Sequence, residues 1–359
     1  MLTRAEWQAR KRAIVQRYAT PSDGRGALQF LSVIAPIAAL WVAIGLADGS
    51  PWLLAAATAA LSLFLLRGFV LMHDCGHDSL FRSRRLNRAG GFLLGVLAGM
   101  PQQVWAENHR YHHLTNGNWA KYRGPLNVAC VTDYLAMDPG ERRRYRRSRD
   151  ILLSPIAGGL YFLVNPRLTW LRASWQLLRR RMARTGERAS LADEPLPYCA
   201  SRAHYRYMAS NNLLLLAACG LMAWAIGPVF FVCYLVSGSL AGGYGIVLFT
   251  VQHNFEHSYA SADEGWDRDE AALRGTSFLV LPGWLNWITA DAAYHHVHHL
   301  CAGVPNYRLA ACHKEHELLF AGVRRVGLFE IPAALKHILW DLAARRLVSV
   351  AEVMRREAA

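Results

Sequence analysis

The sequence lacks the closely spaced cysteines that would hold an iron–sulfur cluster. It has 359 residues and seven cysteines, and none of these forms a CxxC pattern. Two of them lie inside apolar stretches, so we expect reduced and mostly structural thiols, as is typical of a cytosolic face. The cysteines are Cys75, Cys130, Cys199, Cys219, Cys233, Cys301 and Cys312.

Lysine is also scarce. Only Lys11, Lys121, Lys314 and Lys336 are lysines, so arginine carries almost all of the net charge of +14. An excess of positive charge is typical of proteins that bind nucleic acid and of membrane proteins whose loops face anionic lipid. With 53% hydrophobic and 18% charged residues, the sequence alternates apolar blocks with charged blocks. The apolar blocks favour lipid, and we expect no nucleic-acid partner.

Four apolar stretches are predicted to cross a bilayer, which takes about 20 residues of helix. The first begins near Ala27 and is too long for the core of a cleavable signal peptide. Short turns at 48–51 and 227–228 join the four into two helical hairpins. The apolar runs 90–100 and 151–164 are shorter, which favours interfacial or re-entrant segments. The four predicted spans are 27–47, 52–72, 212–226 and 229–251.

The distribution of arginine predicts the side that each segment faces. Segment 101–211 is rich in arginine, whereas neither hairpin turn carries a basic residue. Because positive loops stay inside, both termini and the segments 101–211 and 252–359 are predicted to be cytosolic. The arginine bias also indicates a GC-rich bacterial genome, and hence a bacterial inner membrane.

The predicted fold is an all-α integral membrane protein. A cytosolic N-terminal segment, 1–26, precedes a main domain over 27–310 that combines four transmembrane helices with a cytosolic helical cap. A cytosolic helical tail is predicted over 311–359.

Histidine is abundant and clustered. Ten of the 15 histidines occupy the H positions of two HxxxH and two HxxHH groups. On a helix, positions i, i+3 and i+4 share one face, so each group can direct its imidazoles toward one point. Two groups end predicted spans and two lie in adjacent cytosolic segments, so all four are predicted to meet at one membrane face. The ten are His73, His77, His109, His112, His113, His253, His257, His295, His298 and His299.

This set predicts metal ions rather than isolated surface pairs. Neutral imidazole is a good ligand for iron, copper, zinc and nickel. One ion takes about four to six ligands, so ten imidazoles indicate two ions and a di-metal site in the cap. His296 lies in the last group but off its shared face, and we expect it to be inert or to support a ligand. We interpret His204, His313, His316 and His337 as surface or structural residues.

At these residues the sequence resembles the membrane fatty acid desaturase superfamily, and it is most similar to bacterial acyl-lipid desaturases of the omega-6 (delta-12) type. The resemblance spans roughly 50–310. It implies a cone of four membrane helices, a cytosolic cap with two iron ions, and an O2-dependent removal of two hydrogens from adjacent methylenes of an acyl chain. The stretches that carry it are FVLMHDCGHDSLFRSRRLN at 69–87, ENHRYHHLTNGNW at 107–119, FTVQHNFEHSYA at 249–260 and AAYHHVHHLCAGVPNYRL at 292–309.

The same resemblance implies that the ten histidines are iron ligands. In the third group, the bacterial omega-6 pattern has a histidine at the place of His253 but often an acid at the place of His257. Other branches of the superfamily place a histidine ligand near that second position, so both residues stay in the predicted ligand set. The substrate is expected to be an acyl chain on a lipid, on coenzyme A or on an acyl carrier protein.

Acidic and aromatic residues near the histidines are further candidates. Asp74, Glu256 and Asp291 lie beside the groups and could hold the second nitrogen of a ligand imidazole, although each is equally well interpreted as a solvated or helix-capping acid. An acyl chain must reach the metals from the bilayer, so we expect a dry tunnel. Candidates for its wall, or else for anchoring at the interface, are Trp105, Trp119, Trp284 and Trp287.

Electrons for such a reaction are expected to come from a partner. The sequence has no HPGG haem-binding segment, no GxGxxG pattern and no cysteine set for an iron–sulfur cluster. We therefore expect an external donor of the ferredoxin, rubredoxin or cytochrome type. An acidic carrier would suit the basic cytosolic face, although the positive-inside rule also explains these arginines.

Two alternatives remain open from the residues alone. A hydroxylase or ketolase acting on a fatty acid, alkane or carotenoid would need the same histidines, because hydrogen abstraction comes first in each reaction. A membrane metal-binding or transport protein would also bind metal through histidine. Transporters place polar ligands near the middle of the bilayer, whereas these groups lie at the ends of the predicted spans or beyond them.

Overall fold

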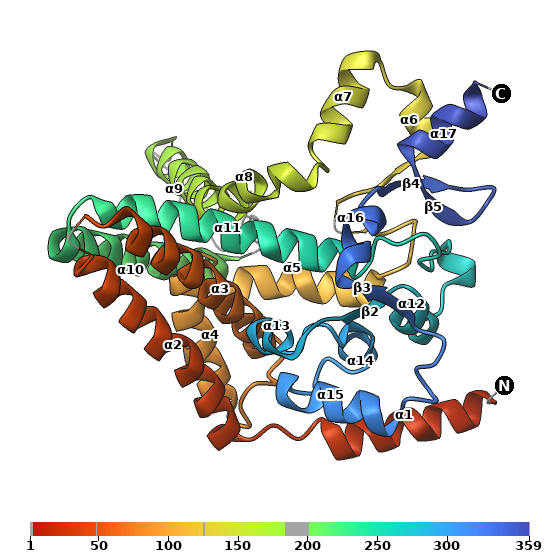
Figure 1. Cartoon of the computed structure of the whole chain (residues 1–359), viewed down its shortest axis with the longest axis horizontal. Helices are drawn as coiled ribbons and strands as arrows, with labels where there is room; N and C mark the ends of the chain where they lie inside the picture. Colours follow the sequence, from red (N-terminus) through yellow and green to blue (C-terminus); the bar gives the residue numbers. More distant parts are fainter. Residues whose placement is uncertain (1–2, 48, 125, 184–200, 359) are drawn as a thin grey trace.

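The fold is that of a computed structural model, which describes residues 3–47, 49–124, 126–183 and 201–358. Cys199 therefore lies outside the described residues. The chain is mostly helical, with a bundle of long helices at one end and a mixed cap of short helices and strands at the other (Figure 1). The N-terminus and the C-terminus both lie at the cap end.

Two helical hairpins form the bundle. In the first, α2 (Asp23–Gly45) is capped by the Ser22 side chain, and α3 (Pro51–Gly76) begins with a proline at its first turn, where no backbone donor is needed. The second hairpin consists of α10 (Arg202–Ile226) and α11 (Val229–Val251). The turns of both hairpins lie at the end opposite the cap (Figure 1). The hairpins touch there, at Gly45 and Ile226. The contact is so close that a Cβ added at Gly45 would lie only 2.8 Å from Ile226 Cγ2.

The described chain contains five helices long and apolar enough to cross a membrane, one more than predicted. Four of them contain the predicted spans, and the fifth is Ile151–Met182. The run 151–164, predicted to be a short segment, is the first part of this longer helical stretch. The stretch consists of η1 (Ile151–Leu153), α8 (Ser154–Gly159), the π-helical turn η2 (Leu160–Val164) and α9 (Asn165–Ala183). Beyond residue 164, arginines interrupt the apolar residues, which hides the continuation from a search for unbroken runs.

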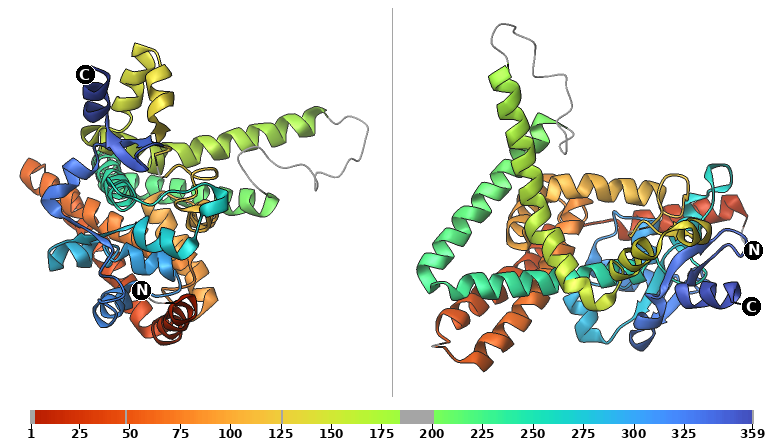
Figure 2. Two further views of the ribbon diagram at one scale, coloured as in Figure 1. Left: turned by 90° about the vertical axis from the view of Figure 1, so that its right-hand side faces the viewer. Right: turned by 90° about the horizontal axis from the view of Figure 1, so that it is seen from above.

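The backbone of α8 lies directly against α11. A Cβ added at Gly158 would come 2.1 Å from the backbone nitrogen of Gly243, and one added at Gly242 would come 2.6 Å from the carbonyl oxygen of Gly158. Only glycine allows two helices to approach so closely. From this contact α9 extends away from the cap (Figure 2) and packs near the start of α10, where Ala173 and Met208 are buried together.

The helices α4 (Arg84–Ala98) and α5 (Gln102–Thr115) connect the first hairpin to the cap. Helix α4 packs against α3, with Gly91 facing the side chains of Cys75 and Gln102. A left-handed glycine, Gly99, ends α4 and turns the chain into α5. This turn brings α5 alongside the end of α3.

The cap is built around short elements after α11. Its core joins α1 (Arg4–Tyr18) to α14 and α15 through Ile14, Val297 and Cys312. The cap elements after α11 are η3 (Asp263–Gly265), α12 (Arg268–Arg274), β2 (Ser277–Val280), α13 (Gly283–Ile288), α14 (His295–Leu300), α15 (Asn306–Glu315), β3 (Arg324–Gly327), η4 (Leu328–Glu330) and α16 (Ile331–Ala334). The remaining elements are β1 (Ala129–Cys130), α6 (Val131–Ala136), α7 (Pro139–Arg147), β4 (His337–Asp341), β5 (Arg346–Ser349) and α17 (Val350–Glu357).

The prediction of an all-α chain is wrong at these five strands, and the tail over 311–359 is not purely helical. Strands β2 and β3 pair in parallel, and a three-stranded sheet has the order β1-β4-β5. In that sheet Ala129 pairs with Leu339, more than two hundred residues away. All five strands are short, and the β1–β4 and β2–β3 pairings join distant segments, so local sequence periodicity does not reveal them.

A buried arginine ties the first hairpin to the cap. Arg67 of α3 is 1% exposed. Its guanidinium donates to Ser32 Oγ at 3.1 Å, to the Gln29 side chain of α2 and to the Trp287 carbonyl of α13, and it lies 4.1 Å from the Trp287 ring centroid. These contacts satisfy a charge that would otherwise be costly to bury.

Replacing Arg67 by methionine is expected to destabilise the fold. The variant removes three part-buried hydrogen bonds and the contact with the Trp287 ring, which costs about 2–4 kcal/mol. The measurement is the thermal unfolding midpoint of the purified protein in detergent. Arg85→Met is the matched control, because Arg85 is exposed. Equal midpoints for the two variants would contradict the structural role of Arg67.

Candidate metal centre

Four segments bring nine of the ten predicted histidines together. His73 and His77 lie at the C-terminal end of α3, and His253 lies two residues after α11. Helix α5 carries His109, His112 and His113, and helix α14 carries His295, His298 and His299. Helices α3 and α11 end at the junction of the bundle and the cap, and α5 and α14 lie beside it. The imidazoles therefore converge where the two parts meet.

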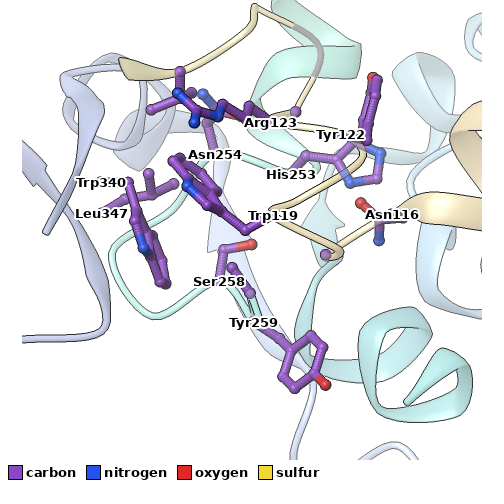
Figure 3. A pocket seen from close by; sticks show the side chains of 14 residues that line it. Asn116, Trp119, Tyr122, Arg123, His253, Asn254, Ser258, Tyr259, Trp340 and Leu347 are labelled. Atoms are coloured by element: carbon purple, nitrogen blue, oxygen red, sulfur yellow. The ribbon is translucent and has the colours of Figure 1, made fainter. Parts of the chain in front are cut away.

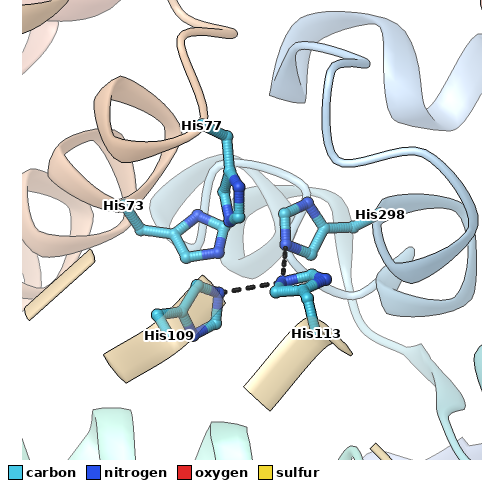
Figure 4. Close-up of side chains that lie close together, drawn as sticks. All are labelled: His73, His77, His109, His113 and His298. Atoms are coloured by element: carbon cyan, nitrogen blue, oxygen red, sulfur yellow. Dashed lines mark hydrogen bonds between the residues drawn. The ribbon is translucent and has the colours of Figure 1, made fainter. Parts of the chain in front are cut away.

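The nine imidazoles separate into two groups. The first group contains His73, His77, His109, His113 and His298, and one nitrogen from each lies within 4.8 Å of the others (Figure 4). The second group contains His112, His253, His295 and His299, within the same limit.

Both HxxHH patterns contribute to both groups, so the prediction that each pattern directs its imidazoles toward one point is wrong for these two. In α5, His109 and His113 point to the first group, whereas His112 points to the second. In α14, His298 belongs to the first group, and the other two ligand candidates belong to the second. Consecutive helical residues point about 100° apart, so neighbours such as His112 and His113 face different points. The two groups are adjacent as a result, and the rings of His113 and His299 stack with centroids 4.2 Å apart.

The spacing of the nitrogens fits two metal ions. Two nitrogens at about 2.1 Å from one ion and at right angles to each other lie about 3 Å apart. Here Nε2 of His113 lies 2.9 Å from Nε2 of His109 and 3.0 Å from Nε2 of His298. In the second group, the Nε2 atoms of His295 and His253 are 2.9 Å apart, and those of His112 and His299 are 3.2 Å apart.

Hydrogen bonds within the groups do not satisfy every imidazole nitrogen. Nε2 of His77 is buried and has no hydrogen-bond partner among the described residues, although its ring faces the other imidazoles of the first group (Figure 4). In the same described part of the chain, Nδ1 of His112 is also buried without a partner. An ion at the centre of each group would accept the converging lone pairs, so the residues present fit a metal at both points.

Burial keeps these imidazoles in the neutral form that binds metal. It lowers the pKa of His253 to about 4, and burial together with neighbouring imidazoles lowers the pKa of the other affected histidines well below 6.5. The uncharged form leaves a lone pair free for a cation. The others whose pKa is lowered are His77, His109, His112, His113, His295, His298 and His299.

Two contacts orient clustered histidines through Nδ1, the ring nitrogen that faces away from the metal points. Asp74 Oδ1 lies 2.9 Å from His73 Nδ1, and Oδ2 of the same carboxylate accepts a 3.2 Å hydrogen bond from the backbone N–H of Asn306. His253 Nδ1 lies 3.1 Å from the carbonyl oxygen of Gly275. Such contacts select the tautomer that presents Nε2 to a metal. The sequence could not predict the contact with Gly275, because every residue has a backbone carbonyl that could make it.

The other two acidic candidates lie elsewhere. Glu256 Oε1 is bonded to Arg346 at 2.9 Å. Burial raises the pKa of Asp291 to about 6 against the opposing effect of Arg67. Among the described residues, neither carboxylate is bonded to one of the nine clustered histidines.

His257 is not brought to either group. Its side chain is 77% exposed, and its Nε2 lies 3.9 Å from Glu256 Oε1. The helix α11 ends at Val251, so His253 and His257 do not share a helical face as their spacing suggested. His296 also points away from both groups, and its Nε2 lies 2.8 Å from His313 Nδ1.

An apolar cavity of ≈ 370 Å³ reaches the histidines from the helical bundle. Phe69, Trp105 and Phe249 line it, and it ends at histidines of both groups. Trp105 therefore lies where a tunnel wall was predicted, whereas Trp284 and Trp287 are 62% and 47% exposed. The histidines in its wall are His73, His109, His295 and His298.

Trp119 lines a different and smaller pocket of ≈ 40 Å³ on the cap side (Figure 3). This pocket reaches His253 of the second group, with Tyr122 beside it. The Trp119 ring also packs against Trp340, with centroids 5.2 Å apart. The second group is thus approached from the cap as well as from the bundle.

Comparison with known proteins gives a consistent result. The family model described as fatty acid desaturase matches residues 50–326. A fatty acid desaturase of Bacillus subtilis is 34% identical over 345 residues, which is 93% of this chain and 88% of that protein.

More distant relatives carry more specific names. The chloroplastic omega-6 fatty acid desaturase of Arabidopsis thaliana is 24% identical over 79% of this chain and 58% of its own length. An sn-1 acyl-lipid omega-3 desaturase (ferredoxin) of Synechocystis is 25% identical over 67% of this chain and 61% of its own length. The chain thus matches about three fifths of each of these two proteins.

Removing one ligand from each group should reduce bound metal. His298→Ala takes a nitrogen from the first group and His112→Ala one from the second, so each is expected to lower the metal content by about one ion per chain. The measurement is elemental analysis of the purified protein. His257→Ala is the matched control and should leave the metal content unchanged. Full metal content in both ligand variants would exclude the two-group assignment.

Proposed function

Because this chain belongs to the fatty acid desaturase family, we propose that it introduces a double bond into the acyl chain of a membrane lipid, in an O2-dependent reaction at two histidine-bound irons. The enzyme is an oxidoreductase. The observation that carries the proposal is the apolar cavity of ≈ 370 Å³ that ends at imidazoles of both groups. A cavity with an apolar wall and nitrogen ligands at its end suits a hydrocarbon chain beside two metals.

The proposed ligand set follows from the two groups. Five imidazoles would hold one ion and four would hold the other, and His257 is not included. Bound irons would supply O2 activation strong enough to remove hydrogen from an unactivated methylene, which side-chain acids and bases cannot do. The protein residues bind and orient: Asp74 holds His73, and the Gly275 carbonyl holds His253.

The cavity wall positions the acyl chain and excludes water. Phe69 and Trp105 pack edge to face with ring centroids 5.1 Å apart, and Trp105 stacks on His109 at 4.6 Å. The Trp105 N–H donates to the hydroxyl oxygen of Tyr161 at 3.1 Å, so the polar edge of the indole has a partner within the cavity wall. A rigid aromatic wall beside a ligand imidazole would hold the reacting methylenes near the metals.

We further propose that α2, α3, α10 and α11 cross the membrane and that Ile151–Met182 does not. Ile151 lines a cavity together with Thr250 at the cap end of α11, so this stretch begins at the cap side. Its later part packs near the start of α10, where Ser174 Oγ lies 2.9 Å from Tyr205 O–H. A stretch that begins and ends on the same side does not cross.

An exposed apolar stripe supports an interfacial position for α9. Its residues are spaced three and four apart, and each is 42–59% exposed. Such a stripe suits a helix that lies in the surface of a bilayer. The residues are Leu168, Leu171, Trp175, Leu178 and Met182.

The cap would face the cytosol of a bacterial cell. Both termini and the arginine-rich helix α7 lie at the cap end (Figure 1), which is the side that the positive-inside rule assigns to the cytosol. Electrons would then arrive from a cytosolic carrier of the ferredoxin, rubredoxin or cytochrome type. The Synechocystis relative is named for ferredoxin, and a basic cytosolic face would attract such an acidic carrier.

The product of the reaction gives the decisive test. Lipids from a host that expresses the chain are expected to contain acyl chains lighter by two hydrogens than those from a host with His298→Ala. Mass spectrometry of the extracted lipids measures this, and the position of the double bond gives the regiochemistry. A hydroxylated product would instead support a hydroxylase, and an unchanged lipid profile with altered metal uptake would support a metal-binding protein.

The topology has its own test. Ser50→Cys, in the first hairpin turn, should react with a membrane-impermeant maleimide added to intact cells. Met182→Cys should react only after lysis, since it would lie at the cytosolic interface. The unsubstituted chain gives the background from native cysteines. Labelling of Met182→Cys in intact cells would mean that Ile151–Met182 crosses the membrane.

A further inference from the structure

A second cavity adjoins the one that reaches the histidines. We call the cavity that contains His73 and His298 in its wall the metal cavity, and the cavity bounded by Arg147, Ile156 and Val247 the entry cavity. The entry cavity has a volume of ≈ 320 Å³ and lies between α11 and the chain that joins α7 to α8. Four residues line both cavities, so only one layer of side chains separates them: Leu126, Ala157, Ile246 and Thr250.

The wall of the entry cavity changes from charged to apolar along the chain. Arg147, Ser148, Arg149 and Asp150 lie on one side, and apolar residues of α8 and α11 form the rest of the wall. Directly after these polar residues, Leu152 is 83% exposed and Ile156 is 63% exposed. Arginine followed by exposed aliphatic side chains is the pattern expected where head groups meet hydrocarbon.

Arg147 has a free guanidinium at this cavity, whereas Arg149 does not. Arg149 donates to the carbonyl oxygens of Leu126 at 2.6 Å and Tyr145 at 3.1 Å, and its guanidinium lies 3.5 Å from the Tyr145 ring centroid. Arg147 is exposed, and no side-chain hydrogen bond or ion pair involves it in the described part of the chain. Asp150 is engaged as a helix cap, since its Oδ1 accepts from the N–H of Leu152 at 3.0 Å.

We propose that a membrane phospholipid reaches the metals through the entry cavity, with its phosphate bound by Arg147 and its acyl chain passing Ala157 into the metal cavity. This inference rests on the proposed function, because it identifies the substrate of that same site. The guanidinium supplies paired donors for a phosphate, and Arg149 adds positive charge beside it. The substrate is thereby a lipid that never leaves the bilayer, rather than an acyl group on a soluble carrier.

The phosphate contact is tested by charge reversal in the full-length enzyme in lipid nanodiscs. Arg147→Glu is expected to raise KM for phosphatidylglycerol about tenfold and to leave kcat within about twofold, because binding changes and the chemistry does not. Arg147→Lys should restore most of the binding. Arg146→Glu is the matched control, since Arg146 is the exposed neighbour in the same last turn of α7 and does not line the cavity. Equal KM values for Arg147→Glu and Arg146→Glu would overturn the assignment.

A binding measurement identifies the group that is recognised. Native mass spectrometry is expected to show less phosphatidylglycerol retained by Arg147→Glu than by the wild type, and equal retention of a galactolipid that lacks phosphate. Equal loss of both lipids would show that no phosphate contact exists. If the phospholipid retention depends on Arg147 but the wild type forms no double bond, the proposed function fails while the lipid site stands.

The route is tested separately at the shared wall. Ala157→Phe would fill the passage between the two cavities, and we expect at least a tenfold loss of desaturation with unchanged metal content. Val164→Phe is the control, because Val164 is 38% exposed in the same helical stretch and lines neither cavity. Wild-type activity in Ala157→Phe would exclude this route even if desaturation itself is established.

Discussion

The close approach of buried, neutral imidazoles is the constraint on which the rest of this structure depends. Nε2 atoms lie 2.9–3.2 Å apart at the junction of bundle and cap. A cation at the centre of each group would bind the converging lone pairs and stabilise this arrangement. Holding it requires that four separate segments deliver their side chains to two adjacent points. The bundle and the cap can be understood as the means of doing so.

Each segment is held by contacts that do not involve the metal points. Helix α3 is joined to α15 where Asp74 accepts from the backbone of Asn306, and to α2 and α13 by Arg67. The end of α11 is held where Gln252 donates to the carbonyl of Ala292 at 2.6 Å, next to α14. The backbone of Ser277, which begins β2, donates to the carbonyl of Gln252 at 2.9 Å. Strand β2 thus has a clear role, since it helps to position Gln252 beside His253.

The junction between bundle and cap also separates what can reach the two metal points. The metal cavity and the entry cavity approach from the helices, and their mostly apolar walls would suit a hydrocarbon chain. The pocket beside Trp119 and Tyr122 approaches His253 from the cap. Under the function proposed above, the lipid would arrive from the bundle and electrons from the cap. The glycine contact between α8 and α11 contributes by placing the chain after α7 directly beside the apolar cavities.

The histidine pattern alone predicted metal binding, and nine of its ten residues lie in the two groups. The regular i, i+3 and i+4 spacing on a helix leaves few directions for an imidazole. The hairpins of long apolar helices followed from hydropathy for a similar reason, since a bilayer imposes length and composition locally. His257 shows where such reasoning ends: HxxxH spacing implies a shared face only if the helix continues, and α11 stops at Val251. The division of His112 and His113 between two points, the distant pairing of Ala129 with Leu339 and the carbonyl of Gly275 behind His253 were decided by tertiary structure. Each of these depends on which remote segment lies alongside, and that is set by packing rather than by the residue types of the segment itself.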